Sequence, residues 1–162
     1  MKSWIPTETC LSCDVCCRFT EADSVWSPAL LEDEIQAYVS QGLLQKAPAR
    51  GRMPLVSNSA EGNHLCAFLI PESHQCRIYA ERPLECQLYP FLLVSRGGKT
   101  WLALDPSCPY AMERLDEPGF QDVLRETLAF LTQPETMDLL RRHPHLFQPY
   151  ENVIDLKELD LS

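Results

Sequence analysis

The stretch ETCLSCDVCCRF, residues 8–19, places four cysteines within eight positions, with the spacing C-x2-C-x2-C-C. Gaps of two residues let neighbouring thiolates converge on one metal, as in zinc sites and iron–sulfur loops. In a helical segment Cys13 and Cys17 would share a face, whereas Cys16 would point about 100° away from Cys17. Adjacent thiolates therefore favour different metal ions, or different corners of one multinuclear cluster. The residues concerned are Cys10, Cys13, Cys16 and Cys17.

Four more cysteines lie downstream, on or beside predicted strands and turns, where a ligand can be held rigidly. They are Cys66, Cys76, Cys86 and Cys108. Cys108 precedes Pro109, and a Cys-Pro pair closes the ligand runs of bacterial iron–sulfur ferredoxins. Eight thiolates could form two four-ligand sites, or one cluster with spare cysteines for redox work. We predict that all eight cysteines serve as metal ligands.

Four disulfides would be the alternative use of these cysteines, with on the order of 100 possible pairings. A bond between the neighbours Cys16 and Cys17 would be strained, because their α-carbons are only about 3.8 Å apart. Eight cysteines in 162 residues also fall below the roughly 8–10 % that is typical of secreted disulfide scaffolds. Both observations favour metal binding over disulfides.

The composition indicates a globular protein, with 45 % hydrophobic and 23 % charged residues. The net charge of −9 argues against nucleic acid and anionic membranes as partners, because there is no cationic surplus to meet phosphates. No apolar run approaches the roughly 20 residues of a membrane span, and MKSWIPTETC does not resemble a secretion signal. We predict a soluble, cytoplasmic protein whose partners are metal ions and a redox or protein partner.

The pattern of the chain predicts an α+β fold in which short antiparallel strands and hairpins carry the cysteines and helices flank them. Ser27, Pro28 and Gly42 would begin and end a first helix, and Gly97-Gly98 predicts a hairpin. Two amphipathic helices follow near residues 120–143, and the tail could add an edge strand. We expect a cysteine-cluster domain over residues 1–115 and a helical extension over residues 116–162, packed on the same domain.

Several residues near the cysteines are candidates for a supporting role. Arginine side chains that follow cysteines could donate hydrogen bonds to sulfur and offset its charge; they are Arg18, Arg77 and Arg82. His64 and His74 flank Cys66 and Cys76, and with enough cysteines available they are interpreted as turn residues or as residues that support the ligands, rather than as ligands. The sequence contains no glycine-rich phosphate loop, no G-x-S-x-G and no H-E-x-x-H motif, and its catalytic residues, if any, are unknown.

The combination of CLSCDVCC, LCAFLIPESHQCRIYAERPLECQLYPF and CPY resembles the YkgJ-type cysteine-cluster family, whose CxxCxxCC domain chelates zinc or iron and whose members are often described as iron–sulfur proteins. The resemblance covers residues 10 to about 110. All eight cysteines match the family pattern, as do Phe68, Leu69, Ile78, Tyr79, Arg82, Pro83, Pro90, Phe91 and Pro109. Three residues depart from it: Asp14 stands where glycine is common, Gln87 where arginine is common, and Tyr89 where phenylalanine is common.

These observations lead to three functional hypotheses. The first is an iron–sulfur or other iron cluster held by cysteine thiolates, for electron transfer, redox sensing or metal handling. The second is structural zinc in two four-cysteine sites, where binding of about 10–16 kcal/mol per site could hold a loop-rich fold together. The third follows from the related cysteine pattern of flagellin lysine N-methylases, and implies methyl transfer to protein lysine.

Overall fold

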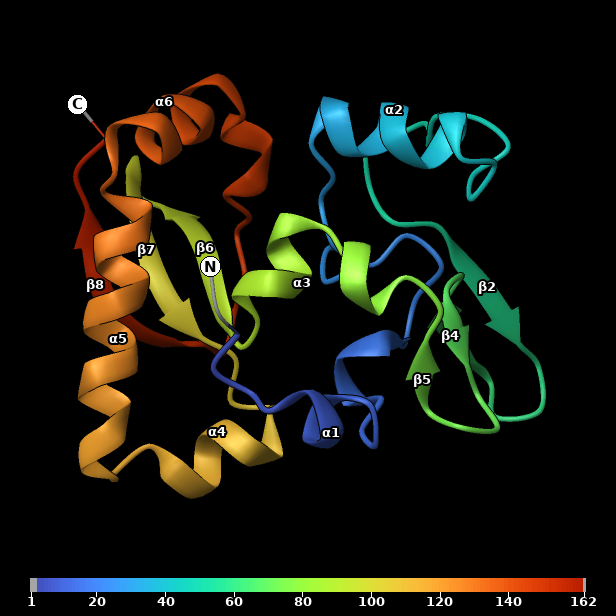
Figure 1. Ribbon diagram of the computed structural model, residues 1–162, viewed down its shortest axis with the longest axis horizontal. Coiled ribbons are helices and arrows are strands. Elements are labelled where there is room, and N and C mark those ends of the chain that lie inside the picture. Colours follow the sequence, from blue (N-terminus) through green and yellow to red (C-terminus); the bar gives the residue numbers. More distant parts are fainter. Residues whose placement is uncertain (1–2, 162) are drawn as a thin grey trace. The chain divides into compact units, whose positions relative to one another are not determined.

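The computed structural model describes residues 3–161 and confirms the α+β class, with helices and small antiparallel sheets (Figure 1). The chain divides into two compact units. One unit comprises residues 7–86, and the other combines residues 1–6 with residues 87–162. The expected division at residue 115 into a domain and an extension stays a prediction. In the described part of the chain, no helix combines the length and the apolar character needed to cross a membrane.

The unit of residues 7–86 is made of short elements joined by tight turns. Its three-stranded sheet has the order β1-β3-β2, and β4 and β5 form a separate antiparallel hairpin. In chain order the elements are α1 (Thr7–Cys10), the 3-10 turn η1 (Val15–Cys17), β1 (Arg18–Phe19), α2 (Glu32–Ser40), β2 (Leu55–Asn58), β3 (Asn63–Cys66), β4 (Leu69–Ile70), β5 (Gln75–Cys76), η2 (Tyr79–Glu81) and α3 (Leu84–Leu88).

The helix α2 begins at Glu32, four residues later than Ser27 and Pro28 had indicated, so that prediction of its start is wrong. Residues 28–30 instead pair with residues 51–53: Met53 N–H donates to the Pro28 carbonyl at 2.8 Å, and Leu30 N–H donates to the Gly51 carbonyl at 2.8 Å. These long-range backbone hydrogen bonds take the place of a first helical turn. The predicted end is confirmed, because Gly42 follows the helix in a left-handed conformation with φ of 71°.

Two glutamates connect α3 with α2 and with the residues just before α2. The Glu34 carboxylate accepts the Leu31 N–H at 2.8 Å and the Leu84 N–H at 2.7 Å. Glu85 accepts the Ala29 N–H at 2.7 Å, and burial raises the pKa of Glu85 to about 7. The start of α3 is therefore anchored by the Glu34 side chain, 50 residues earlier in the chain, and by the bond from the Ala29 backbone to Glu85.

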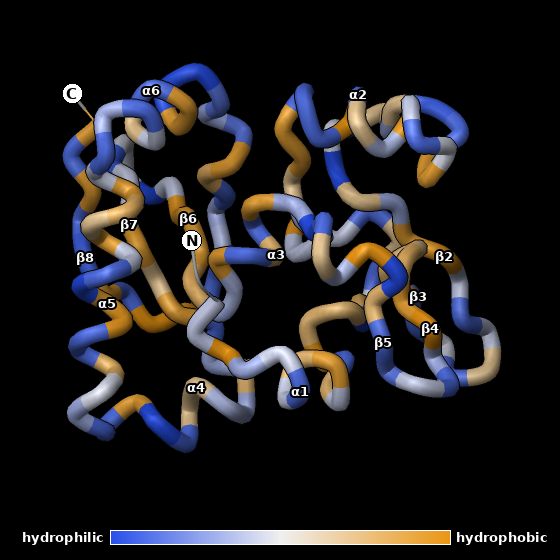
Figure 2. The backbone as a smooth tube through the Cα atoms, in the orientation of Figure 1, coloured by the Kyte–Doolittle hydropathy of each residue, from blue (hydrophilic) through white to orange (hydrophobic). Residues whose placement is uncertain are grey.

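The second unit is built on an antiparallel sheet of order β6-β7-β8. The strands are β6 (Phe91–Arg96), β7 (Lys99–Leu104) and β8 (Ile154–Leu159). Gly97 and Gly98 join β6 to β7 with φ of 58° and 76°, which confirms the predicted hairpin. The tail pairs with β7 as the predicted edge strand. Figure 2 shows hydrophobic residues along β6 and β7, and Leu102, Ala103 and Leu104 are completely buried.

Helices pack on this sheet and complete the core of the second unit. They are α4 (Pro109–Arg114), α5 (Pro118–Leu131), α6 (Pro134–Arg142) and the 3-10 turn η3 (Pro144–Leu146). The structure confirms the two predicted amphipathic helices, which bury Leu131 and Leu140. Trp4 joins the same core, with its ring 5.8 Å from Phe91 and 5.4 Å from Phe120 between centroids.

Candidate metal centre

Seven of the eight cysteines lie in the unit of residues 7–86, and all eight are free thiols. The first four occupy consecutive turns. Cys10 ends α1, and the Cys13 N–H donates to the Cys10 carbonyl at 3.2 Å. Cys16 and Cys17 lie in η1, and the Cys17 N–H donates to the Asp14 carbonyl at 2.9 Å. The segment is thus a tight loop and not the regular helix over Cys13–Phe19 considered from its spacing.

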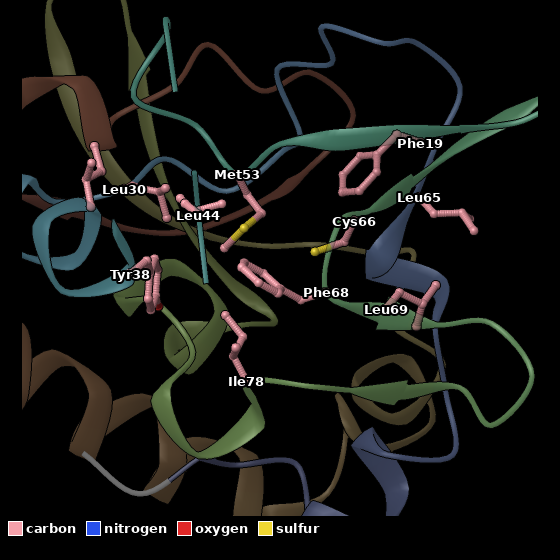
Figure 3. Packing of buried hydrophobic residues seen from close by; sticks show 11 residues of the cluster. Phe19, Leu30, Tyr38, Leu44, Met53, Leu65, Cys66, Phe68, Leu69 and Ile78 are labelled. Atoms are coloured by element: carbon pink, nitrogen blue, oxygen red, sulfur yellow. The ribbon is translucent and has the colours of Figure 1, made fainter. Parts of the chain in front are cut away.

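The three downstream cysteines of this unit come from separate elements. Cys66 ends β3, Cys76 ends β5, and Cys86 lies within α3. Cys66 is part of the buried core cluster, and Cys17 and Cys76 pack against that cluster. In Figure 3 the sulfur of Cys66 is directed toward Met53 and Phe68. Three of the cysteines therefore lie in or against one hydrophobic cluster.

The electrostatics of the thiols show that they are neighbours. Burial raises the pKa of Cys86 well above its usual value, and nearby Cys17, Cys66 and Cys76 raise it further. The pKa of Cys10 is likewise raised, mainly by burial, with contributions from Cys17 and Cys13. Because like charges interact strongly only at short range in a protein, the structure brings together Cys17 and Cys86, which are 69 residues apart in the sequence.

The adjacent pair differs in its readiness to ionise. The Cys16 thiol donates a hydrogen bond to Cys17, which lowers the pKa of Cys17 below its ordinary value. The pKa of Cys16 is raised for the same reason, and burial adds to the rise. One proton shared between neighbouring sulfurs means that the second thiolate is costly to form without a cation.

Burial has the same effect elsewhere in the set. It raises the pKa of Cys66 to about 12, and it raises the pKa of Cys76 as well. At neutral pH these thiols hold their protons unless a cation replaces them. Metal ions bind the deprotonated form, so binding would release protons and relieve the mutual repulsion of the sulfurs.

The donor set fits a thiophilic metal, since soft thiolates select zinc, iron–sulfur clusters and Cu(I). Within residues 3–161, however, no three Cys, His, Asp or Glu side chains are closed around a single point as a metal would hold them. The cysteines of this unit affect one another's ionisation without closing around a metal position. Residues able to hold the metal are the seven cysteines of this unit.

The arginines predicted to support the site differ in their surroundings. Arg82 lies over the Tyr79 ring at 4.0 Å from its centroid, and its charge lowers the pKa of Cys10 and Cys76 against the larger effect of burial. Arg18 acts on Cys17 in the same direction. Arg77 donates to the Ala67 carbonyl and lies 5.7 Å from the centre of the Phe68 ring.

Two residues near the thiols were not predicted to take part. Asp14 accepts hydrogen bonds from Arg18 and His74, and these lower the pKa of Asp14, with Arg18 contributing most. Tyr79, named from the sequence only as part of the family pattern, has a buried hydroxyl close enough to Cys10 to favour its thiolate. The sequence signals for Asp14 were its place inside the cysteine motif and its departure from the glycine of the family pattern. Tyr79 carried no signal beyond the family pattern.

The remaining candidates lie elsewhere. His64 sits in β3 opposite Phe19 and Ser57, and its Nδ1 atom is buried. Cys108 belongs to the second unit, where it is buried immediately before α4 and its carbonyl accepts the Met112 N–H at 3.1 Å. The assignment of Cys108 as a ligand stays a prediction.

Comparison with known proteins links this geometry to a family. A family model described as "CxxCxxCC: Putative zinc- or iron-chelating domain" matches residues 9–109. The match spans the whole N-terminal motif and every downstream cysteine. No curated protein and no solved structure gave a match. The chain therefore belongs to the CxxCxxCC family of zinc- or iron-chelating domains.

Proposed function

We propose that the unit of residues 7–86 holds an iron–sulfur or other iron centre through its cysteine thiolates, and that the protein serves electron transfer or redox sensing. The observation that carries the proposal is the mutual electrostatic influence of seven thiols within one unit. The proposed ligands are Cys10, Cys13, Cys16, Cys17, Cys66, Cys76 and Cys86. When bound, such a centre supplies one-electron redox chemistry.

The number of thiols favours iron over structural zinc. Two closed zinc sites of four cysteines each would need eight thiolates, so with seven in this unit the zinc alternative also requires Cys108. An iron–sulfur cluster contributes its own bridging sulfides, so it needs fewer protein ligands for each metal ion. The adjacent pair Cys16 and Cys17 also suits a multinuclear centre, since neighbouring side chains diverge from the backbone.

The protein groups around the thiols support a centre with net negative charge. Arg82 is held over Tyr79, where its cation acts on both Cys10 and Cys76. Cys66, Cys17 and Cys76 share an apolar base, which would limit access of water to sulfur. Hydrogen bonding and solvent exposure around the sulfurs are the features that tune such centres.

The experiment that tests the function is anaerobic purification followed by measurement of iron, zinc and acid-labile sulfide, with a visible absorption spectrum. We expect stoichiometric iron and absorption from thiolate-bound iron. Stoichiometric zinc with a colourless protein would support the structural-zinc alternative. A folded, metal-free protein would contradict both.

A further inference from the structure

The carboxylate of Asp14 connects parts of the chain that carry different cysteines. Asp14 lies between Cys13 and Cys16, and its side chain is only 13 % exposed. Its Oδ2 atom is 2.8 Å from Nε and 2.7 Å from Nη2 of Arg18, and 2.8 Å from Nδ1 of His74. Since an ionised carboxylate only accepts, the Nδ1 atom of His74 carries the proton in this contact.

The two partners of Asp14 belong to the neighbouring cysteine segments. His74 lies in the turn between β4 and β5, two residues before Cys76. Arg18 begins β1, directly after Cys17, and its Nη1 atom donates to Oε2 of Glu61 at 2.5 Å. Glu61 lies in the turn that leads into β3, the strand that ends at Cys66. This network therefore reaches from the N-terminal motif to both downstream hairpins.

The backbone of His74 adopts a conformation that is unfavourable for most residues, and the fold keeps it. His74 has φ of 57°, in the left-handed region that most side chains avoid. Its side chain is 48 % exposed, so burial of the ring does not explain the conformation. The contact with Asp14 is a hydrogen bond to a largely buried carboxylate, which is stronger than an exposed ion pair.

We propose that Asp14 is a positioning residue for the metal centre, holding the loop of residues 10–17 against the β4–β5 turn so that the thiols stay gathered before metal binds. This inference rests on the proposed function. Asp14 is not itself proposed as a ligand, because its Oδ2 atom already accepts hydrogen bonds from Arg18 and His74. Its effect is on affinity through preorganisation, in the manner of residues that support metal ligands.

The test is anaerobic titration of the reduced, metal-free chain with Co²⁺, whose thiolate absorption bands report both affinity and ligand type. We expect Asp14→Asn to weaken Co²⁺ binding by about 10–100-fold, because the carboxylate that pairs with the Arg18 guanidinium and accepts the His74 N–H is lost. The spectrum at saturation should be unchanged, because the sulfur ligands are the same. Asp23→Asn is the matched control: Asp23 pairs with Arg50 at 2.9 Å in the same unit, but both side chains are more than 60 % exposed.

A second pair of variants separates the effect of the hydrogen bond between His74 and Asp14 from the effect of the His74 backbone conformation. His74→Gly removes the donor to Asp14 while it keeps the left-handed conformation accessible. His74→Asn places an amide N–H near the position of Nδ1 and also tolerates positive φ. We expect His74→Gly to weaken Co²⁺ binding and His74→Asn to restore it. Because His74 is in an exposed turn, these variants decide the question even if Asp14→Asn fails to fold.

Wild-type affinity in both Asp14→Asn and His74→Gly would overturn the inference. The Cys17→Ser variant distinguishes this failure from failure of the proposed function. If Cys17→Ser abolishes Co²⁺ binding while Asp14→Asn binds normally, only the role of Asp14 is wrong. If the wild-type chain binds no Co²⁺, or Cys17→Ser binds it equally well, the metal centre and the inference fall together.

Discussion

At the scale of single residues, the most unusual feature is the adjacent pair Cys16 and Cys17. Their thiols share a hydrogen bond, so one is easier to ionise and the other is harder. Cys16 and Cys17 both interact electrostatically with Cys10 and Cys86. The proposed centre is therefore a single one that uses both members of the pair.

The pair yields a direct prediction. We expect Cys16→Ser and Cys17→Ser each to lower the metal content of the anaerobically purified protein by more than half, because a single merged centre loses a ligand in either case. Elemental analysis per folded chain is the measurement, and Cys108→Ser shows whether the cysteine of the second unit contributes. A large loss for one member of the pair and none for the other would indicate two separate sites.

Tyr38 gives a prediction about pH. Its buried hydroxyl donates to the Glu81 carbonyl at 2.6 Å, and burial raises the pKa of Tyr38 above its usual value of about 10. At neutral pH, Tyr38→Phe should reduce the free energy of unfolding by about 0.5–1.5 kcal/mol through the lost hydrogen bond.

The sign of the pH effect follows from linkage. Above about pH 10 the unfolded chain loses the phenol proton, whereas the folded protein keeps it. Stability of the wild type therefore falls with pH in this range, and Tyr38→Phe lacks that contribution. Denaturant melts at pH 8 and pH 11 should show the difference between the two proteins narrowing. A difference that widens at pH 11 would show that the phenol ionises more readily in the fold.

At the scale of elements, two glycines differ in their backbone conformation, because one lies in a turn and the other in a helix. Gly98 has φ of 76° in the β6–β7 hairpin, whereas Gly119 lies in α5, and a Cβ atom would meet nothing within 4 Å at either position. Gly98→Ala should reduce stability by about 1–2 kcal/mol from backbone conformation alone. Gly119→Ala should instead increase it by about 0.5–1 kcal/mol. Thermal unfolding of both variants is the measurement, and equal shifts of the same sign would contradict this account.

Elements with strong local signals could be predicted from the sequence. The Gly97-Gly98 hairpin, α5, α6 and the final strand follow from turn chemistry and periodicity. The start of α2 could not, because residues 28–30 pair with residues 51–53. The same limit applies to the site. The cysteines can be identified in the sequence. The hydrogen bond between His74 and Asp14 cannot, because the two residues are 60 positions apart and no local pattern predicts the contact.

At the scale of the whole molecule, the proposed metal centre would make stability depend on metal. A ligand present at 100 times its dissociation constant adds about 2.7 kcal/mol to the free energy of unfolding. We expect anaerobic removal of metal to lower the melting temperature and to speed hydrogen exchange chiefly within residues 7–86. The Cys17→Ser variant should show little response to the chelator. An equal response of wild type and variant would show that the chelator acts elsewhere.

The central claim is that cysteines from distant parts of residues 7–86 jointly hold inorganic ions. Native mass spectrometry of the anaerobically purified protein tests it most directly. The account predicts a mass above that of the polypeptide by a fixed set of metal ions, with or without sulfide, which is lost on denaturation and absent from Cys17→Ser. A folded chain with the mass of the polypeptide alone, or lighter by the hydrogens lost to disulfides, would contradict the account.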